Sequence, residues 1–370
     1  MRHDIPFRAV AVQAAVAEAS LYLHSPATRE SVVLSGTARR IWEAIEYPSS
    51  IDDIAGALRA EFEAPAELIR ADVAATLSEF LRLGLAAVVP GPRPDPIRYR
   101  YLSLLKRSLA NTLYPELELQ IQHLQQGAEG LSGIALQRFH RDIAERQPEE
   151  YARLMTAKQQ GTAPIRFPYT MIGLFRLANI ERCAEEVIAE GVPGDFLEAG
   201  VCKGGAAIFM RALQVAHGAS ERRTWVVDSF EGVPPSDMPA DAGYGLHFEE
   251  GRQPWLACSE GAVREHFRRY GLLDANVRFL PGWLADTLPS APTGPLAILR
   301  IDLDLYSSTK QCLDLLYDRV SPGGFVIVDE YGDLRSCRDA VDDFRQRRGV
   351  EEPIRWADYS GVYWRKGDGA

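Results

Sequence analysis

Apolar runs and amphipathic stretches alternate through residues 170–330, in the pattern of strands joined by helices. Apolar residues recur at three- and four-residue spacing from Thr170 to about Glu190, which predicts a helix with one buried side. Short apolar runs after this helix predict five strands. Strands that alternate with helices form a parallel, doubly wound α/β sheet. The predicted strands are 195–200, 224–230, 277–280, 295–301 and 324–328, and an SPGG turn is expected before the last one.

The beginning of the chain has a different pattern, in which β-like runs precede helical periodicity. Strands are predicted at 8–14, 20–24 and 31–34, and helices at 37–45, 50–62 and 66–83, before an apolar run at 85–89. Three strands, three helices and an extended tail are typical of a winged-helix domain. The third helix mixes acidic and basic side chains, so its face is not basic enough to hold nucleic-acid phosphates.

A proline-rich segment divides the chain. Residues 90–96 read PGPRPDP, and four prolines in seven residues cannot continue a helix or a central strand. We therefore predict a domain over 1–90, a linker and helical region over 91–168, and the α/β domain over 169–370. The helical region is polar with a broken apolar stripe, and its periodicity does not show whether it covers another part of the chain or packs against another subunit.

Composition narrows the classes of function. The 370 residues carry 41 Lys and Arg against 51 Asp and Glu, a net charge of −10, which disfavours a general nucleic-acid-binding protein. No apolar run approaches the roughly 18 residues of a membrane span, and the N-terminus has no signal-peptide pattern. The cysteines are scattered without a CxxC pair, which favours reduced thiols and a cytoplasmic location. They are Cys183, Cys202, Cys258, Cys312 and Cys337.

A glycine-rich turn joins the first predicted strand to the next helix. It reads Gly200-Val-Cys-Lys-Gly204-Gly205, a spacing that fits a dinucleotide fingerprint poorly and the looser loop of S-adenosylmethionine sites better. Asp228 ends the following strand, where a carboxylate can accept the hydroxyls of an adenosine ribose. An ordinary turn and a solvated strand end are the alternatives.

Carboxylates also follow the fourth and fifth strands. Asp302 comes directly after one of these strands, and Asp329 and Glu330 come directly after the other. Acids gathered in one cleft repel each other unless a cation or a proton intervenes, and hard oxygen ligands suit Mg²⁺. The sequence therefore predicts a magnesium site that orients and acidifies a substrate hydroxyl, with solvated strand ends as the alternative.

Residues 98–366 resemble the macrocin O-methyltransferase family (TylF and MycF type). The resemblance rests on strings such as GVPGDFLEAGVCKGGAAIFMRA, WVVDSFEGVP, LRIDLDLYSSTKQCLDLLY and SPGGFVIVDEY. It implies a Rossmann-like class I methyltransferase that moves a methyl group from S-adenosylmethionine to a hydroxyl, in known members a sugar hydroxyl. The implied metal ligands are Asp302, Asp329 and Glu330, with Asp302 and a general base at His247 as catalytic residues.

The same resemblance gives a cofactor-binding set and two departures. Family members commonly carry Trp-Arg where this chain has Cys202-Lys203, and Asp where it has Glu330. The longer side chain of Glu330 puts its metal geometry in question. The predicted cofactor-binding residues are Thr170, Met171, Glu198, Gly200, Gly204, Gly205, Asp228, Ser229 and Asp286.

Residues 20–88 resemble the PqqD family of peptide-recognition domains. The matching elements are the Leu34-Ser35-Gly36 strand end, the Ile-Trp pair and an Asp-Val-x-x-x-Leu helix that ends in Gly-Leu. The resemblance implies binding of the leader segment of a ribosomally made precursor peptide, added as a strand to the edge at 31–34. The predicted contacts are Val32, Val33, Leu34, Asp72, Val73 and Thr76, with burial in the domain core as the alternative for the apolar ones.

Three hypotheses of function follow. The leading one is an S-adenosylmethionine- and Mg²⁺-dependent O-methyltransferase that acts on a precursor peptide held through its leader. The alternatives are methylation of a sugar hydroxyl on a small glycosylated natural product, and an inactive peptide-binding protein. We expect a homo-oligomer, with a dimer favoured, and neither nucleic acid nor membrane as a partner.

Overall fold

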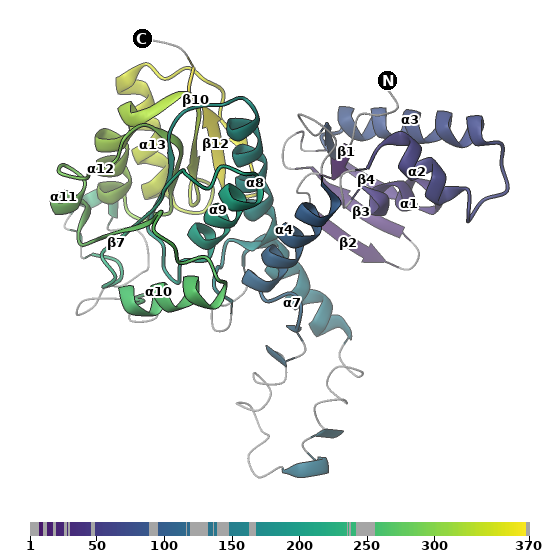
Figure 1. The fold of residues 1–370 in the computed structure, drawn as a ribbon, viewed down its shortest axis with the longest axis horizontal. Helices are drawn as coiled ribbons and strands as arrows, with labels where there is room; N and C mark the ends of the chain where they lie inside the picture. The colour runs from purple at the N-terminus through teal and green to yellow at the C-terminus, as the bar shows by residue number, and fades with distance from the viewer. Residues whose placement is uncertain are drawn as a thin grey trace.

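The chain forms a smaller N-terminal domain and a larger α/β domain in the computed structural model (Figure 1). Helix α4 (Pro96–Leu109) stands between the two domains. The structure describes residues 7–9, 13–17, 20–25, 28, 30–45, 49–88, 95–115, 117–118, 132–135, 137–138, 148–162, 168–234, 236, 238–241 and 256–367.

The larger domain is built on a seven-stranded sheet, in the order β11-β12-β10-β9-β6-β7-β8. Strands β10, β9, β6, β7 and β8 pair in parallel, whereas β12 and β11 are antiparallel. The prediction of a doubly wound α/β domain is confirmed. The strands are β6 (Asp195–Ala199), β7 (Thr224–Asp228), β8 (Val277–Pro281), β9 (Leu296–Ile301), β10 (Val320–Val328), β11 (Arg355–Trp356) and β12 (Val362–Arg365).

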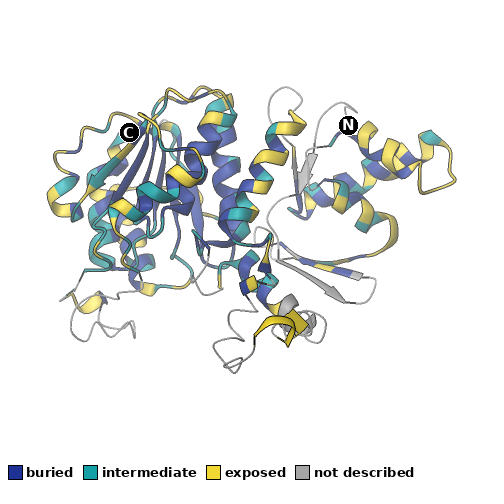
Figure 2. Ribbon diagram, turned by 60° about the horizontal axis from the view of Figure 1, so that its bottom comes forward, coloured by how far each residue is buried: buried dark blue, intermediate teal, exposed yellow. Residues whose placement is uncertain are grey.

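Helices cover both faces of this sheet, and the strands between them are buried (Figure 2). One core holds α4, α8 (Gly173–Ala189), α9 (Gly205–Ala216) and α10 (Glu260–Arg269) against the sheet. The other holds α11 (Leu284–Thr287), α12 (Tyr306–Leu316) and α13 (Arg335–Arg348). The remaining described elements of the domain are α7 (Pro148–Gln160) and the short 3₁₀ turns η1 (Pro239–Asp241) and η2 (Tyr317–Arg319).

The N-terminal domain packs a three-stranded antiparallel sheet and three helices around its own core. The sheet order is β2-β3-β4, so β4 is an edge strand. The extended tail, β5, pairs antiparallel with β1. The elements are β1 (Phe7–Ala9), β2 (Gln13–Ala17), β3 (Ser20–His24), β4 (Ser31–Leu34), α1 (Gly36–Ala44), α2 (Ile51–Leu58), α3 (Ala66–Arg82) and β5 (Ala86–Val88).

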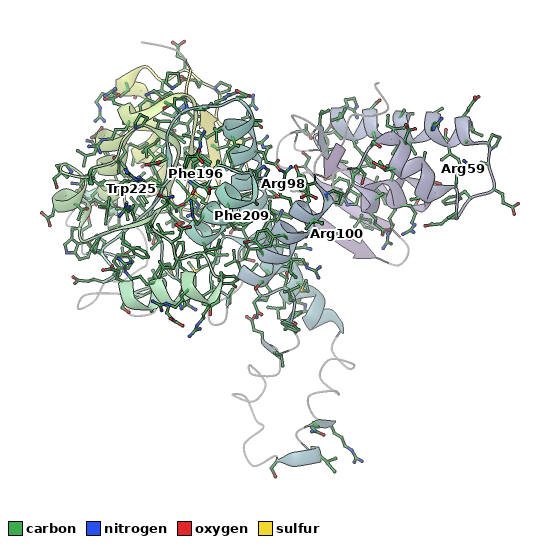
Figure 3. All side chains as sticks on the ribbon, viewed as in Figure 1. Arg59, Arg98, Arg100, Phe196, Phe209 and Trp225 are labelled. Atoms are coloured by element: carbon green, nitrogen blue, oxygen red, sulfur yellow. The ribbon has the colours of Figure 1, made fainter. Side chains whose placement is uncertain are left out.

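Helix α4 is anchored to the α/β domain along one face. Its Tyr99 hydroxyl donates to Glu185 of α8 at 2.6 Å, and Lys106 pairs with Glu181 at 2.5 Å. At the end of the helix, the Leu109 carbonyl accepts from the Tyr169 N–H at 2.9 Å. Figure 3 shows Phe196 and Phe209 inside the larger domain, with Arg98 and Arg100 of α4 near its junction with the smaller one.

Two local predictions are wrong. The single strand expected at 8–14 is two strands, because β1 pairs with β5 whereas β2 pairs with β3. The SPGG sequence is not a turn before a strand, since β10 already begins at Val320 and its register shifts between Val320 and Phe325. Gly323, with φ of 80°, accommodates this irregularity within the strand. The part of the proline-rich segment at 90–94 lies outside the described residues.

The structure also bears on two predictions made from composition, which concern membrane-spanning segments and cysteine pairing. None of the helices in the described ranges is long and apolar enough to cross a bilayer. None of the five cysteines forms a disulfide.

Candidate active site

A cavity of about 340 Å³ opens at the carboxyl ends of the parallel strands. It lies where ligands bind in doubly wound sheets, because the loops after neighbouring strands diverge there. Its walls come from the segments after β6, β7, β8, β9 and β10 and from the first turns of α12. The lining residues with the most evident chemistry are Met171, Gly200, Cys202, Asp228, Ser229, Trp283, Asp302, Asp304, Ser307, Ser308, Gln311 and Glu330.

Gly200 brings the glycine-rich turn against the end of β9. Its φ of 81° lies in the left-handed region, and a Cβ there would stand 2.0 Å from the carbonyl oxygen of Asp302. The Asp302 N–H in turn donates to the carbonyl of Ala199 at 2.9 Å. Only glycine permits this approach, which places the turn beside the predicted metal ligands.

The other two glycines of the turn start helix α9 and do not line the cavity. Gly204 is the N-terminal flanking residue of α9, and the Gly205 N–H donates to the carbonyl of Tyr169 at 3.0 Å. This bond ties the turn to the segment that leads into α8. Thr170, in that segment, is buried, whereas its neighbour Met171 reaches the cavity.

Asp228 lies on the cavity wall and also holds the glycine-rich turn. One carboxylate oxygen accepts from the Val201 N–H at 2.7 Å, and the other accepts from the Phe230 N–H at 2.7 Å. Burial raises the pKa of Asp228, while these backbone donors act in the opposite direction. Each oxygen also accepts a second, longer hydrogen bond, from the Cys202 N–H at 3.4 Å and from the Ser229 hydroxyl at 3.5 Å, and a ligand hydroxyl would compete with these weaker contacts.

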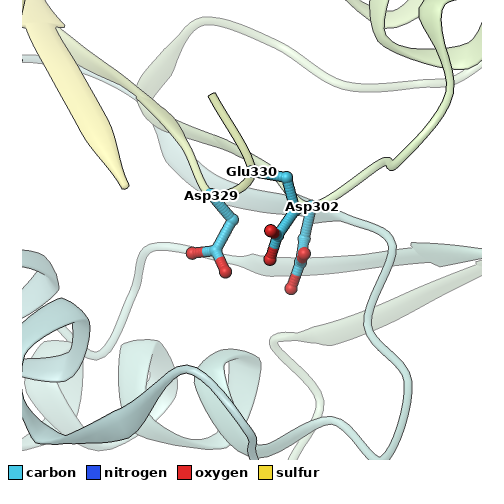
Figure 4. A group of neighbouring side chains, drawn as sticks. All are labelled: Asp302, Asp329 and Glu330. Atoms are coloured by element: carbon cyan, nitrogen blue, oxygen red, sulfur yellow. The ribbon is translucent and has the colours of Figure 1, made fainter. Parts of the chain in front are cut away.

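Three carboxylates from β9 and β10 converge as the sequence predicts. One oxygen of each of Asp302, Asp329 and Glu330 lies within 4.8 Å of the others (Figure 4). The parallel strands β9 and β10 are hydrogen-bonded neighbours, and their ends reach the same edge of the sheet. The prediction that these acids share one site therefore matches the geometry.

Two buried arginines hold the carboxylates in place. Arg300 lies within β9 and is 0% exposed. Its guanidinium group contacts Glu198, and it also reaches Asp302 at 3.1 Å and Asp329 at 2.5 Å. Arg176 of α8, 4% exposed, contacts Asp329 from the other side. It also reaches Glu330 at 3.2 Å and Asp358 at 2.9 Å. These guanidinium groups are the cations that the sequence analysis missed.

The pKa values of the acids separate according to their contacts. Although burial opposes its charge, Arg176 and Arg300 together hold the pKa of Asp329 below its usual value. Burial and the neighbouring Asp329 raise the pKa of Asp302 to about 6. Burial raises the pKa of Glu198 to about 8 despite its contact with Arg300. Asp329 therefore stays ionised while its neighbours retain protons to higher pH.

The carboxyl groups of this cluster outnumber its guanidinium groups, so the cluster carries an excess of negative charge once its acids are ionised. The Asp304 carboxylate faces the cavity without a hydrogen-bond or ion-pair partner in the described part of the chain, and burial beside Asp302 raises its pKa to about 7. A hard divalent cation suits this charge balance and an all-oxygen donor set, so the residues present fit Mg²⁺. The cluster consists of six carboxylates, Glu198, Asp302, Asp304, Asp329, Glu330 and Asp358, and the guanidinium groups of Arg176 and Arg300.

The structure does not bring every predicted residue to the cavity. Glu198 lies beneath it, bound to Arg300, and Asp286 is exposed on α11 because the turn after β8 directs Trp283 and Ala285 inward instead. His247 lies outside the described residues.

Among the predicted peptide contacts, some side chains are exposed and others are buried. On the edge strand β4, Val33 is 53% exposed and Val32 is half-buried, and on α3 Asp72 is exposed and Thr76 half-buried. By contrast, Leu34 is 4% exposed and Val73 is 0% exposed, so both belong to the domain core. For these two positions the structure favours the alternative of burial.

The residues that the sequence analysis missed had a visible signal. Arg300 interrupts the apolar run PLAILRI, and Arg176 lies among the apolar positions of its helix. A charged residue on a buried face is rare unless it is paired, and that rarity identifies both. Trp283, which follows the strand at 277–281, could have been found by its place at a strand end.

Family models match two separate parts of the chain. One described as macrocin O-methyltransferase (TylF) matches residues 98–366. Another, described as coenzyme PQQ synthesis protein D (PqqD), matches residues 21–86.

Named relatives resemble the larger part of the chain. One is 8-demethyl-8-(2,3-dimethoxy-α-L-rhamnosyl)-tetracenomycin-C 4′-O-methyltransferase of Streptomyces olivaceus, 45% identical over 73% of this chain and 94% of that protein. Mycinamicin III 3″-O-methyltransferase of Micromonospora griseorubida is 40% identical over 72% of this chain and 96% of its own length. The solved structure of the O-methyltransferase NovP superposes with a TM-score of 0.60 at 40% identity, covering 73% of this chain and 99% of NovP.

Proposed function

The chain belongs to the macrocin O-methyltransferase family and is an S-adenosylmethionine-dependent O-methyltransferase, and on this premise we propose that it methylates a sugar hydroxyl of a glycosylated natural product. Two relatives that align over more than 90% of their own lengths are named for glycosylated acceptors. The observation that carries the proposal is the cavity with clustered carboxylates at the strand ends. The inactive peptide-binding alternative is disfavoured, because these relatives are named enzymes.

We assign the walls of the cavity to the cofactor and the metal as follows. Gly200, Asp228, Ser229 and Met171 would hold S-adenosylmethionine, and Asp302, Asp329 and Glu330 would hold Mg²⁺. The cofactor supplies an electrophilic methyl group when bound, and the metal lowers the pKa of a hydroxyl. Both assignments rest on the positions of this chain's own residues around the cavity.

The protein's own residues then prepare the acceptor. Arg300 and Arg176 fix Asp329 in its ionised form, which keeps the cluster negative and oriented. Asp302 faces the cavity, and its carboxylate can accept the hydroxyl proton. His247 remains the other predicted general base. Methyl transfer needs a near-linear approach, so the reaction depends on positioning by these groups.

Asp302→Asn tests this assignment. The amide neither binds a divalent cation well nor accepts a proton, so methyl transfer should fall by about 100-fold or more. The assay uses tritiated S-adenosylmethionine with the acceptors of the two relatives, the rhamnosyl-tetracenomycin and mycinamicin III. Asp286→Asn, exposed and outside the cavity, is the matched control. Unchanged transfer by Asp302→Asn would exclude the proposed site.

A second candidate substrate is a ribosomally made precursor peptide. The PqqD match and the edge strand β4 with exposed Val33 favour it. A leader peptide can add to this edge through its backbone hydrogen bonds. The two candidates are compatible if the sugar is attached to the peptide.

Val33→Asp tests the peptide candidate. A charge on the exposed edge should weaken binding of a fluorescent leader peptide about tenfold, while methylation of a small glycoside stays unchanged. Val215→Asp, at an exposed apolar position on α9, controls for the added charge. Equal binding by both variants would argue against β4 as the leader site.

The expected homo-oligomer also remains a proposal. Helix α4 exposes Ile97, Tyr101 and Leu104 at helical spacing, on the face opposite its contacts with α8. A contiguous apolar stripe of this kind often marks an interface. Light scattering of the full chain at several concentrations measures the oligomeric state directly, and Leu104→Glu should shift it toward the monomer if this stripe is the contact.

A further inference from the structure

A single buried carboxylate joins two walls of the cavity. Asp241, 7% exposed, ends the short turn η1 and reaches the start of helix α12. One of its oxygens accepts from the Tyr306 N–H at 2.6 Å. The other accepts from the hydroxyls of Ser307 at 3.1 Å and Ser236 at 2.5 Å.

This carboxylate supplies the cap that α12 lacks in its own sequence. The residue before the helix is Leu305, whose side chain cannot accept a hydrogen bond from the first turn. The free N–H groups of a helix start need an acceptor, and negative charge is favourable there. Asp241 satisfies both needs from a distance of more than sixty positions along the chain.

The two segments that Asp241 joins each line the cavity. From the chain after β7 come Gly232, Val233 and Pro234, only a few residues before Ser236 and Asp241. From α12 come Ser307, Ser308 and Gln311. Helix α12 also packs on α11, whose Leu284 and Ala285 border the same cavity. A shift of α12 would therefore move several walls at once.

We propose that Asp241 is a positioning residue for S-adenosylmethionine, holding the wall after β7 and the wall on α12 at the separation that the cofactor requires. The inference rests on the proposed placement of the cofactor in this cavity. Asp241 does not line the cavity and acts through Ser307 and the backbone of Tyr306. A cavity whose walls are joined in advance needs less ordering when the ligand binds, which strengthens binding.

Titration calorimetry of the full-length protein with S-adenosylmethionine tests the inference. Asp241→Ala removes the joint, and its affinity should be about tenfold weaker, the fold-change expected from one lost cap contact. Asp241→Asn keeps an acceptor for the Tyr306 N–H and an amide that can donate to a serine hydroxyl oxygen. Its affinity should stay within about twofold of the wild type.

Ser50→Ala separates positioning from general stability. Ser50 caps α2 in the N-terminal domain, where its hydroxyl accepts from the Asp53 N–H at 3.2 Å. Its loss should lower the melting temperature without changing cofactor affinity. Wild-type affinity in Asp241→Ala, or equal weakening in Asp241→Asn and Asp241→Ala, would overturn the inference. Absence of binding by the wild-type protein would instead exclude the placement of the cofactor.

Discussion

Both domains carry exposed ion pairs among their described residues, but the α/β domain also has a buried set. In the N-terminal domain the ion pairs lie in solvent, as in Arg40 with Glu61 and Arg70 with Asp52. In the α/β domain Arg300 and Arg176 are buried among carboxylates. Exposed pairs contribute little to stability, whereas a buried charge is costly once its partner is removed. The difference indicates that the buried charges of the α/β domain serve its chemistry.

Arg300→Met should give the largest effect. It removes the cation that Glu198 and Asp329 share and leaves both acids buried, which costs about 3–5 kcal/mol of unfolding free energy. Urea denaturation followed by tryptophan fluorescence measures it. Arg40→Met, which breaks an exposed pair in the N-terminal domain, is the matched control and should leave the midpoint unchanged. Similar midpoints for the two variants would remove the contrast between the domains.

Gly200→Ala and Gly36→Ala compare the backbone in the two domains. Both glycines have positive φ, but a Cβ at Gly36 meets nothing within 4 Å, whereas one at Gly200 meets the Asp302 carbonyl. Gly36→Ala should cost about 1–2 kcal/mol and Gly200→Ala about 2–4 kcal/mol. Thermal unfolding measures both, and a smaller loss for Gly200→Ala would contradict the close approach.

The contributions of Glu198 in the α/β domain and Glu43 in the N-terminal domain to stability should depend on pH with opposite signs. Burial raises the folded pKa of Glu198 to about 8, so its contribution is present at low pH and is lost as pH rises toward and through 8. Hydrogen bonding from Arg39 lowers the pKa of Glu43, so its contribution is lost as pH falls. The slope from Glu198 is at most about 1.4 kcal/mol per pH unit.

Melting curves in EDTA between pH 5 and 9 test this sign. Glu198→Gln should flatten the decline in stability as pH rises from 5 to about 8, because the amide cannot ionise. Glu43→Gln should leave that decline intact. A decline that is equally steep in Glu198→Gln would show that Glu198 does not carry it.

Sequence patterns predicted the convergence of Asp302, Asp329 and Glu330 because parallel strands end at one edge of a sheet. They did not predict Arg300 and Arg176, since periodicity marks which face is apolar and gives no partner for a charge on that face. The prediction that Asp286 lies at the cofactor site did not match the structure for a related reason. Strand ends were recognisable, but the direction of each side chain after β8 depends on the turn into α11.

The buried position of Arg300 also constrains the order in which the chain can acquire its fold. Its partners, Glu198 and Asp329, are separated by more than a hundred residues, and Asp329 is made last. Burial of strand β9 is costly while Asp329 is still inside the ribosome, because Arg300 would then be buried with fewer counter-charges. The central strands should therefore close together late in synthesis, after the N-terminal domain has had time to fold independently.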